Sequence, residues 1–219
     1  MARLGHSGST TLLRRKLFPN GFAGEVMRHV LETWNKFSLH HKVRQETPIT
    51  AVFHAALIKA YVAAGRRWFI TLEDPITEPD FGTQTGRNDL RFYPPDHHGQ
   101  TIFFTMEFKR LRVTTKSGLK HLTNEYADEG IQRFVDGRYS VGLPCGGIVG
   151  YVMDNEISKA FVSVQKEIET KRTVLKMPTQ NGIRVPSTVL PDHQWSADTF
   201  HKRTDGEFAL HHALVGVTS

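Results

Sequence analysis

The sequence contains little cysteine and no long apolar run, and both absences narrow the classes of protein that it can encode. Cys145 is the single cysteine among 219 residues, which excludes an intramolecular disulfide and a cysteine-based zinc site. This cysteine usage is typical of a reducing compartment. No apolar stretch approaches the roughly 20 residues that a transmembrane helix needs. The sequence therefore predicts a cytoplasmic protein with no membrane contact.

A secretory signal is also absent, as are internal repeats and low-complexity linkers. The first twenty residues are basic, with Arg14, Arg15 and Lys16 in a row, but they lack the continuous apolar core of a signal peptide. We interpret residues 1–20 as a flexible basic N-terminal arm. Residues 21–219 are then expected to form a single α/β domain.

What the chain does contain is enough apolar material for a core and an excess of positive charge. Hydrophobic residues make up 39% and aromatic residues 10% of the chain, and the formal net charge is +6. These proportions are too apolar for a disordered chain. The positive balance is compatible with an anionic partner such as nucleic acid, although many basic proteins bind none.

Apolar residues at helical spacing predict helices over residues 24–37, 48–64, 117–137 and 155–172. For the second helix, Thr47 is the expected N-cap, Pro48 suits the first turn, and Gly65 marks the end. Ser117 is the expected cap of the third helix.

Changes of period predict strands between these helices. A β-meander is expected over residues 67–113, with a loop at residues 75–88, and a strand buried on both faces over residues 146–154. The chain should end in a hairpin over residues 199–217, closed by Asp205-Gly206 as a type I′ turn pair. This order predicts a mixed central β-sheet flanked by helices.

Three polar residues stand out in the expected meander. Side chains alternate along a strand, so Glu107 and Lys109 point to the same face, and Asp89 opens the neighbouring strand. Two carboxylates with no soft ligand nearby suit Mg²⁺ or Mn²⁺. A lysine ammonium beside them can stabilise the charge that develops during phosphodiester hydrolysis.

This pattern resembles the PD-(D/E)XK nuclease superfamily, which has the restriction-endonuclease-like fold. Asp89 matches the first acid, Glu107 the second and Lys109 the lysine, while Asn88 stands where the proline of the motif is usual. The resemblance covers residues 20–170 by element order but only three residues by identity. It implies Mg²⁺-dependent hydrolysis of DNA, less often RNA, in a defence or repair system, with Asp89 and Glu107 as metal ligands.

The resemblance also implies an additional acid and supporting polar groups. For the acid we favour Glu73 and Glu78 over Glu25 and Glu32 of the first helix, because they lie nearer the meander, although a solvated surface position suits each of them as well. Supporting or phosphate-binding side chains are expected among a further group of residues: Gln132, Arg133, Arg138, Tyr139, His201 and Arg203. For His201 and Arg203, which share a strand face that His211 could oppose, a structural role is the alternative.

A basic run continues out of the expected site and could neutralise nucleic-acid phosphates, or form an ordinary solvated face: Arg110, Arg112, Lys116 and Lys120. By analogy with small nucleases, an ATPase or helicase partner and a homodimer are further expectations. Two other functions stay open. The same fold could serve as a non-catalytic nucleic-acid-binding module, or as an assembly subunit whose basic charge contacts an acidic protein.

Overall fold

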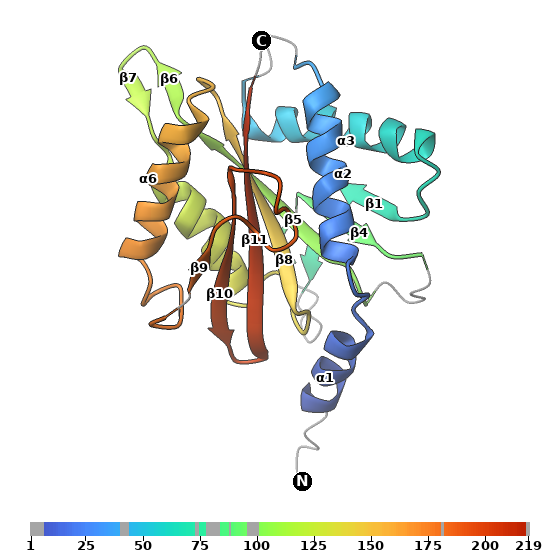
Figure 1. Ribbon diagram of the computed structural model, residues 1–219. Helices are drawn as coiled ribbons and strands as arrows, with labels where there is room; N and C mark the ends of the chain where they lie inside the picture. The colour runs from blue at the N-terminus through green and yellow to red at the C-terminus, as the bar shows by residue number, and fades with distance from the viewer. Residues whose placement is uncertain are drawn as a thin grey trace.

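A mixed seven-stranded sheet with helices on both faces forms the centre of the protein (Figure 1). The computed structural model describes residues 7–39, 44–72, 75–77, 84–87, 89–95, 101–180 and 182–217. The strand order across the sheet is β1-β4-β5-β8-β11-β10-β9. The α/β class and the mixed, helix-flanked sheet predicted from the sequence are therefore confirmed.

The strands of this sheet are β1 (Phe69–Leu72), β4 (Leu90–Tyr93), β5 (Phe104–Leu111), β8 (Cys145–Val152), β9 (Ile183–Arg184), β10 (Ser196–Arg203) and β11 (Gly206–Gly216). β1, β4 and β5 are antiparallel neighbours, which confirms the predicted meander. β8 runs parallel to both β5 and β11, and β10 runs antiparallel to β11 and β9. All eight residues of β8 are buried, as expected of a strand with helices on both sides.

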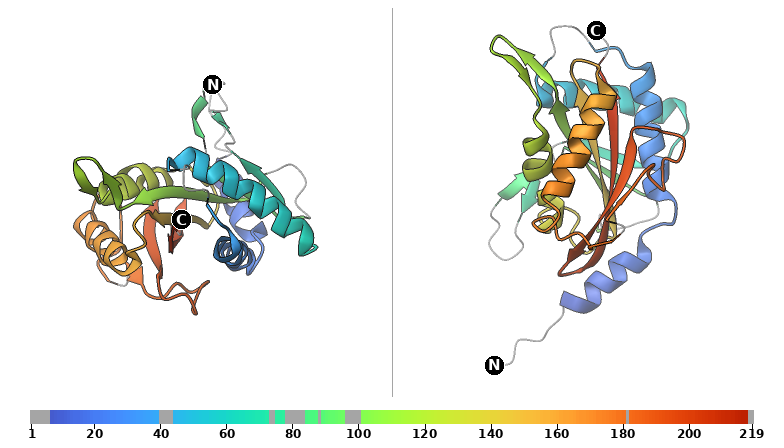
Figure 2. Two further views of the ribbon diagram at one scale, coloured as in Figure 1. Left: turned by 90° about the horizontal axis from the view of Figure 1, so that it is seen from above. Right: turned by 60° about the vertical axis from the view of Figure 1, so that its left-hand side comes forward.

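The helices are α1 (Ser7–Leu17), α2 (Phe22–Lys36), α3 (Glu46–Ala63), α4 (Thr123–Glu125), the π-helix η1 (Tyr126–Ile131), α5 (Gln132–Val135) and α6 (Ile157–Thr170). α1 lies within the predicted N-terminal arm and extends away from the sheet (Figure 2). Among the described residues, no helix has both the length and the apolar character that crossing a bilayer requires.

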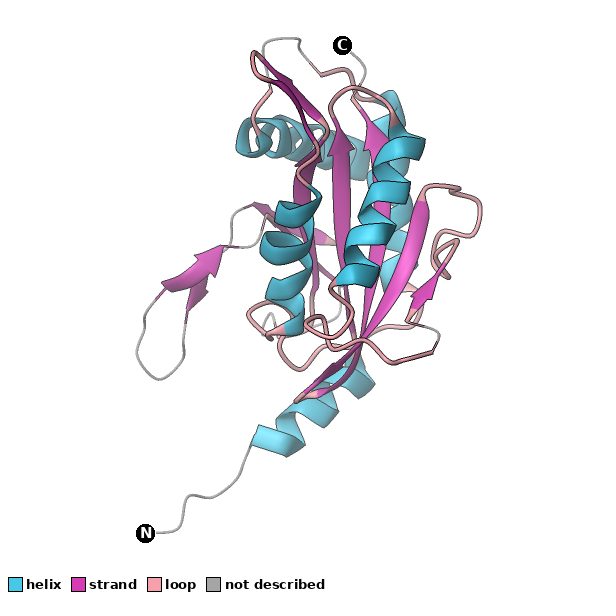
Figure 3. Cartoon of the chain, turned by 90° about the vertical axis from the view of Figure 1, so that its left-hand side faces the viewer, coloured by secondary structure: helices cyan, strands magenta, loops and turns pink. Residues whose placement is uncertain are grey.

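Side-chain alternation divides the core into two layers. Phe108 of β5 belongs to a cluster that α2 and α3 cover, whereas Leu111 belongs to a cluster covered by η1, α5 and α6. Figure 3 shows α6 and the helical segment 123–135 in front of the second face. Glu107 and Lys109 alternate with Phe108, so they point into the second layer, toward η1.

Four local predictions were wrong. The helix expected over residues 117–137 begins only at Thr123, because residues 113–120 form the hairpin of β6 (Val113–Thr115) and β7 (Gly118–Lys120). Ser117 therefore lies in a turn, where the φ of 113° at Gly118 suits glycine. In the predicted loop 75–88, β2 (Pro75–Thr77) pairs with β3 (Gln84–Arg87).

The other two errors concern a cap and a turn. α3 begins at Glu46 with Gln45 as its N-cap, so Thr47 lies inside the first turn. The final hairpin pairs Arg203 with Gly206 around Thr204 and Asp205, so Asp205-Gly206 is not the central pair. Gly206 has a φ of 116°, but Asp205 lacks the positive φ that a type I′ turn needs at both central positions.

Candidate active site

The site begins where β5 extends past the end of β4, its neighbour on one side. β4 pairs with β5 from Phe92↔Phe104 to Leu90↔Met106, and two carboxylates accept the backbone N–H groups that follow. Asp89 Oδ2 accepts from the N–H of Phe108 at 2.7 Å, and Glu46 Oε2 accepts from that of Arg110 at 2.9 Å. The open strand edge thus draws one acid from the start of β4 and another from the start of α3.

Lys109 contacts both Glu46 and Glu107, the second carboxylate of the predicted motif. Its Nζ lies 2.8 Å from Glu107 Oε1 and 2.8 Å from Glu46 Oε1. Glu107 is 0% exposed and Lys109 is 8% exposed. Three of the four charged groups here come from the predicted triad Asp89, Glu107 and Lys109, and the fourth, Glu46, was not predicted.

The helical segment on the second face closes the site. The glycine at position 130, in η1, lies close against Ile148, because a Cβ there would lie only 2.6 Å from Ile148 Cδ1, whereas it would meet Lys109 Cγ at the ordinary contact distance of 3.5 Å. Arg133 Nη1 lies 3.2 Å from Glu107 Oε1 and donates to the Tyr139 hydroxyl at 2.9 Å. π-helical turns are frequent at functional sites. η1 leads directly into α5, which places Arg133, one of the predicted supporting residues, beside Glu107.

The two predicted acids have strongly raised pKa values. Burial raises the pKa of Asp89 to about 6, against the opposing effects of Lys109 and the Phe108 N–H. Burial, with the nearby charge of Asp89, raises the pKa of Glu107 to about 8. The charge of Asp89 thus disfavours ionisation of Glu107, as expected of acids that share a site.

The pKa of Lys109 is raised as well, but for a different reason. Burial alone would lower the pKa of Lys109, but the carboxylates of Glu107, Glu46 and Asp89 outweigh it and raise that pKa. Apart from the exposed Glu129, which also pairs with Arg133, three carboxylates face two cations, Lys109 and Arg133. When these five groups are ionised, together they carry one net negative charge.

This arrangement suits a hard divalent cation. Glu107 Oε2 is buried and makes no hydrogen bond with the described residues, so a carboxylate oxygen remains to be satisfied. No three His, Cys, Asp or Glu side chains in the described ranges are grouped to hold a metal by themselves. Mg²⁺ is often bound by only one or two carboxylates together with substrate phosphates and water, and Asp89 and Glu107 supply that number.

A further carboxylate beside Lys109 comes from the second predicted helix, where no site residue was expected. Glu46 opens α3, and its separation of 63 residues from Lys109 leaves no local pattern that links them. Glu25, the first-helix alternative, pairs instead with Arg66 at 2.5 Å. Glu73 and Glu78 lie outside the described residues.

Other predicted site residues make contacts elsewhere. Gln132 Nε2 donates to Asp136 Oδ1 at 2.7 Å, and Arg138 pairs with the same acid at 3.6 Å. Arg112 is 7% exposed and its guanidinium pairs with Asp154 at 2.9 Å, so its charge is used inside the protein.

The rest of the basic run lies nearer the surface. Lys116 and Lys120 are exposed on the β6–β7 hairpin. Arg110 is partly exposed, and its Nη1 donates to the Arg44 carbonyl at 2.8 Å. These three side chains are the part of the predicted phosphate-binding run that solvent can reach.

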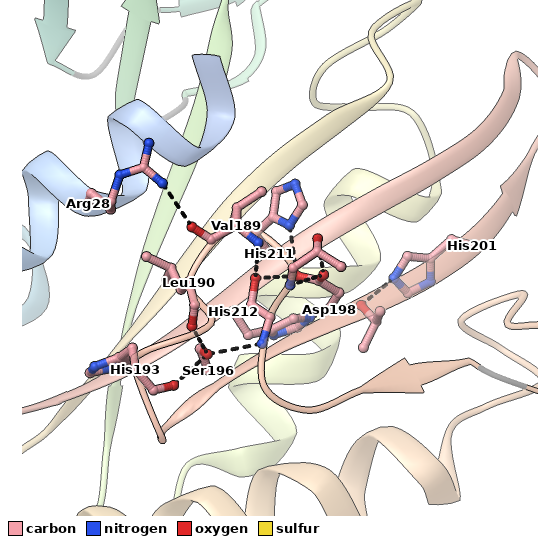
Figure 4. Close-up of polar contacts among 12 residues, drawn as sticks. Arg28, Val189, Leu190, His193, Ser196, Asp198, His201, His211 and His212 are labelled. Atoms are coloured by element: carbon pink, nitrogen blue, oxygen red, sulfur yellow. Dashed lines mark hydrogen bonds and ion pairs between the residues drawn. The ribbon is translucent and has the colours of Figure 1, made fainter. Parts of the chain in front are cut away.

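His201 belongs to the protein interior (Figure 4). It is 1% exposed, with Nδ1 2.7 Å from the Leu175 carbonyl and Nε2 2.7 Å from Thr199 Oγ1. His211 was expected to oppose it across the hairpin, but this was wrong: His211 pairs with Asp198 in the register, and their Nδ1 and Oδ1 atoms lie 2.8 Å apart. His201 therefore makes the internal bonds expected of a structural histidine.

Arg203 is likewise held inside, 8% exposed, by Asp205 and by backbone carbonyls of the loop after α5.

In comparisons with known proteins, the chain matched no protein-family model, no curated protein and no solved structure. The geometry of the site is therefore the basis for a functional proposal.

Proposed function

We propose that this protein is a Mg²⁺- or Mn²⁺-dependent nuclease of the PD-(D/E)XK type that hydrolyses phosphodiester bonds, most favourably in DNA. One observation carries the proposal: Asp89, Glu107, Lys109 and Glu46 meet at the open edge of a single strand, and burial raises the pKa values of Asp89 and Glu107. Side chains with strongly perturbed pKa values cluster at functional sites.

The topology around this cluster supports the same proposal. The meander β1-β4-β5 is followed by a helical segment and by β8 parallel to β5, the order that a restriction-endonuclease-like core would have. Asp89 precedes the second strand of the meander, and Glu107 and Lys109 lie on the third. These positions support the proposed match to the motif.

Each group has a chemical role in this proposal. Asp89 and Glu107 would hold the ion, which would acidify a water molecule and neutralise charge on the phosphate. Lys109 places a fixed positive charge beside them, where it can stabilise the negative charge that develops on the phosphate. Glu46 holds the Lys109 ammonium at 2.8 Å and limits the positions that it can adopt.

The proposed nucleic-acid substrate would approach the site across a basic surface. Lys116 and Lys120 on the β6–β7 hairpin and Arg110 on β5 are available to nucleic-acid phosphates. The single cysteine, Cys145, is buried and free, which supports a reducing compartment such as the cytoplasm. Pairing with a second copy, or with an ATPase or helicase, in a defence or repair system is proposed by analogy alone.

Cleavage assays on supercoiled plasmid, single-stranded DNA and RNA, with Mg²⁺, Mn²⁺ or EDTA, test the proposal. Asp89→Asn and Lys109→Gln should each reduce cleavage at least about 100-fold, because each removes a charge that acts on the reacting phosphate. Glu169→Gln and Lys159→Gln are matched controls, since both alter exposed ion pairs on α6. Full activity in Asp89→Asn or Lys109→Gln would reject the assignment.

A non-catalytic nucleic-acid-binding module, or an assembly subunit with the same fold, is the second candidate. It is favoured by the ion pairs that Lys109 and Arg133 already make with Glu107, because they neutralise much of the site without a metal. This candidate predicts that labelled DNA binds equally in EDTA and in Mg²⁺ and is never cut. For an assembly subunit, a co-purified acidic protein would bind in place of DNA.

A further inference from the structure

A buried guanidinium at the far end of the sheet holds the loop that follows α5. Arg203, the last residue of β10, donates to the carbonyls of Tyr139 and Ser140, each at 3.3 Å. Asp205 orients this guanidinium by accepting from its Nε at 2.8 Å, and it also accepts from the N–H of Gly142 at 2.8 Å. The hairpin end thus fixes several points of one short loop.

The loop needs such support because of its backbone. Ser140 has a φ of 54°, in the left-handed region that residues with a side chain seldom adopt. A conformation of this kind persists only where surrounding contacts hold it. The bonds from Arg203 act on Ser140 and on its neighbour Tyr139, whose N–H also donates to the Arg133 carbonyl at 3.1 Å.

Tyr139 transmits this constraint to the candidate site. It is 2% exposed, and its hydroxyl accepts from Arg133 Nη1 at 2.9 Å, while the same nitrogen lies 3.2 Å from Glu107 Oε1. The other contact of the guanidinium is with Glu129, whose side chain is 57% exposed. Because exposed ion pairs hold side chains weakly, the buried hydroxyl is the stronger constraint on Arg133.

We propose that Arg203 is a positioning residue, which acts through Tyr139 to hold Arg133 against Glu107. Its guanidinium is occupied by the loop carbonyls and by Asp205, so it supports the site from a distance instead of binding a phosphate. The catalytic consequence of this role rests on the proposed nuclease function, whereas the mechanical link does not.

Nuclear magnetic relaxation of the Arg133 Nε–H group, in protein free of metal and substrate, measures the link directly. Tyr139→Phe removes the hydroxyl, and Arg203→Lys keeps a positive charge but loses the forked contact with the carbonyls. In each variant the order parameter of Arg133 should fall toward that of the exposed Arg138. The double variant should fall no further than Tyr139→Phe, because both changes act on one contact.

Ser196→Ala is the matched control for a general loss of stability. It removes a buried hydroxyl bond from the same strand β10, far along the strand from the loop, and should leave Arg133 rigid. An unchanged Arg133 in Tyr139→Phe or Arg203→Lys, or an equal loss of order in Ser196→Ala, would overturn the positioning role.

Cleavage by the same variants is measured separately. If the wild type cuts nucleic acid, kcat should fall roughly tenfold or more in Tyr139→Phe and Arg203→Lys with KM nearly constant, since a displaced group near the reacting atoms lowers the rate. If kcat instead stays at the wild-type value in both, the positioning role has no catalytic consequence and that part of the proposal is overturned. A wild type that cuts nothing would reject the nuclease proposal alone, because the relaxation measurement still decides the link.

Discussion

Replacing Glu107 with glutamine should stabilise the protein at high pH, even though it removes an acid from the candidate site. Glu107 is 0% exposed, and burial, with the charge of Asp89, raises its pKa from the usual 4.5 to about 8. Glutamine has nearly the shape of the protonated acid. The variant therefore avoids the cost of a buried negative charge, a trade of function against stability that is common at active sites.

The sign and size of the effect follow from proton linkage. Below about pH 4.5, Glu107 is protonated in the folded and the unfolded state, so both proteins should have similar free energies of unfolding. Between pH 4.5 and about 8, the unfolded chain releases this proton while the folded protein keeps it, which progressively destabilises the wild type. At about 1.4 kcal/mol per pK unit, the full difference is on the order of 5 kcal/mol, and about 2–5 kcal/mol is expected because neighbouring groups titrate with Glu107.

Urea unfolding at pH 5 and pH 9, in EDTA, measures this difference. The matched control is Glu129→Gln, because Glu129 also pairs with Arg133 but is 57% exposed; it should change stability little at either pH. Adding Mg²⁺ at pH 8 should stabilise the wild type more than Glu107→Gln, since a ligand of the folded state shifts unfolding by mass action. A glutamine variant that is destabilised equally at pH 5 and pH 9 would contradict a raised pKa of Glu107 in the folded protein.

Two further predictions concern the buried polar groups of the terminal hairpin. Asp198 is 0% exposed and accepts from Ser187, Thr188 and His211; burial opposes its ionisation, but these donors hold its pKa well below the usual range. Its stabilising contribution is therefore present at neutral pH and lost only as the pH falls into strong acid. Asp198→Asn should cost about 3 kcal/mol in urea unfolding at pH 7. A loss no larger than that of Asp192→Asn, on the exposed loop before β10, would contradict this. Burial lowers the pKa of His201 to about 4 and that of His212 to about 3, so stability should fall as the pH drops from about 6.5 through these values, and ring chemical shifts that report either histidine protonated at pH 6 would disprove the prediction.

Local chemistry in the sequence was sufficient for much of the fold and for three groups of the site. Glu107 and Lys109 share a face because alternation is a property of the strand itself, and the uninterrupted apolar run of β8 reflects burial on both sides. The conformation of the segment at Ser117 and Gly118 could not be predicted from local chemistry alone. A serine can cap a helix or open a turn, and the pairing of β6 with β7 decided for the turn.

The remainder depended on packing between segments that are distant in sequence. Glu46 reaches Lys109 because α3 begins beside the open edge of β5. Arg133 reaches Glu107 because η1 and α5 cover the face of the sheet toward which Glu107 points. Arginine is a residue type that commonly binds phosphate, but Arg203 is buried and its guanidinium donates to backbone carbonyls and to Asp205. The face that each side chain takes along its own strand or helix can be read from the sequence, because it follows from backbone geometry. Which charges meet and which are buried depends on the packing of whole elements, because that packing sets the contacts and the desolvation of each group.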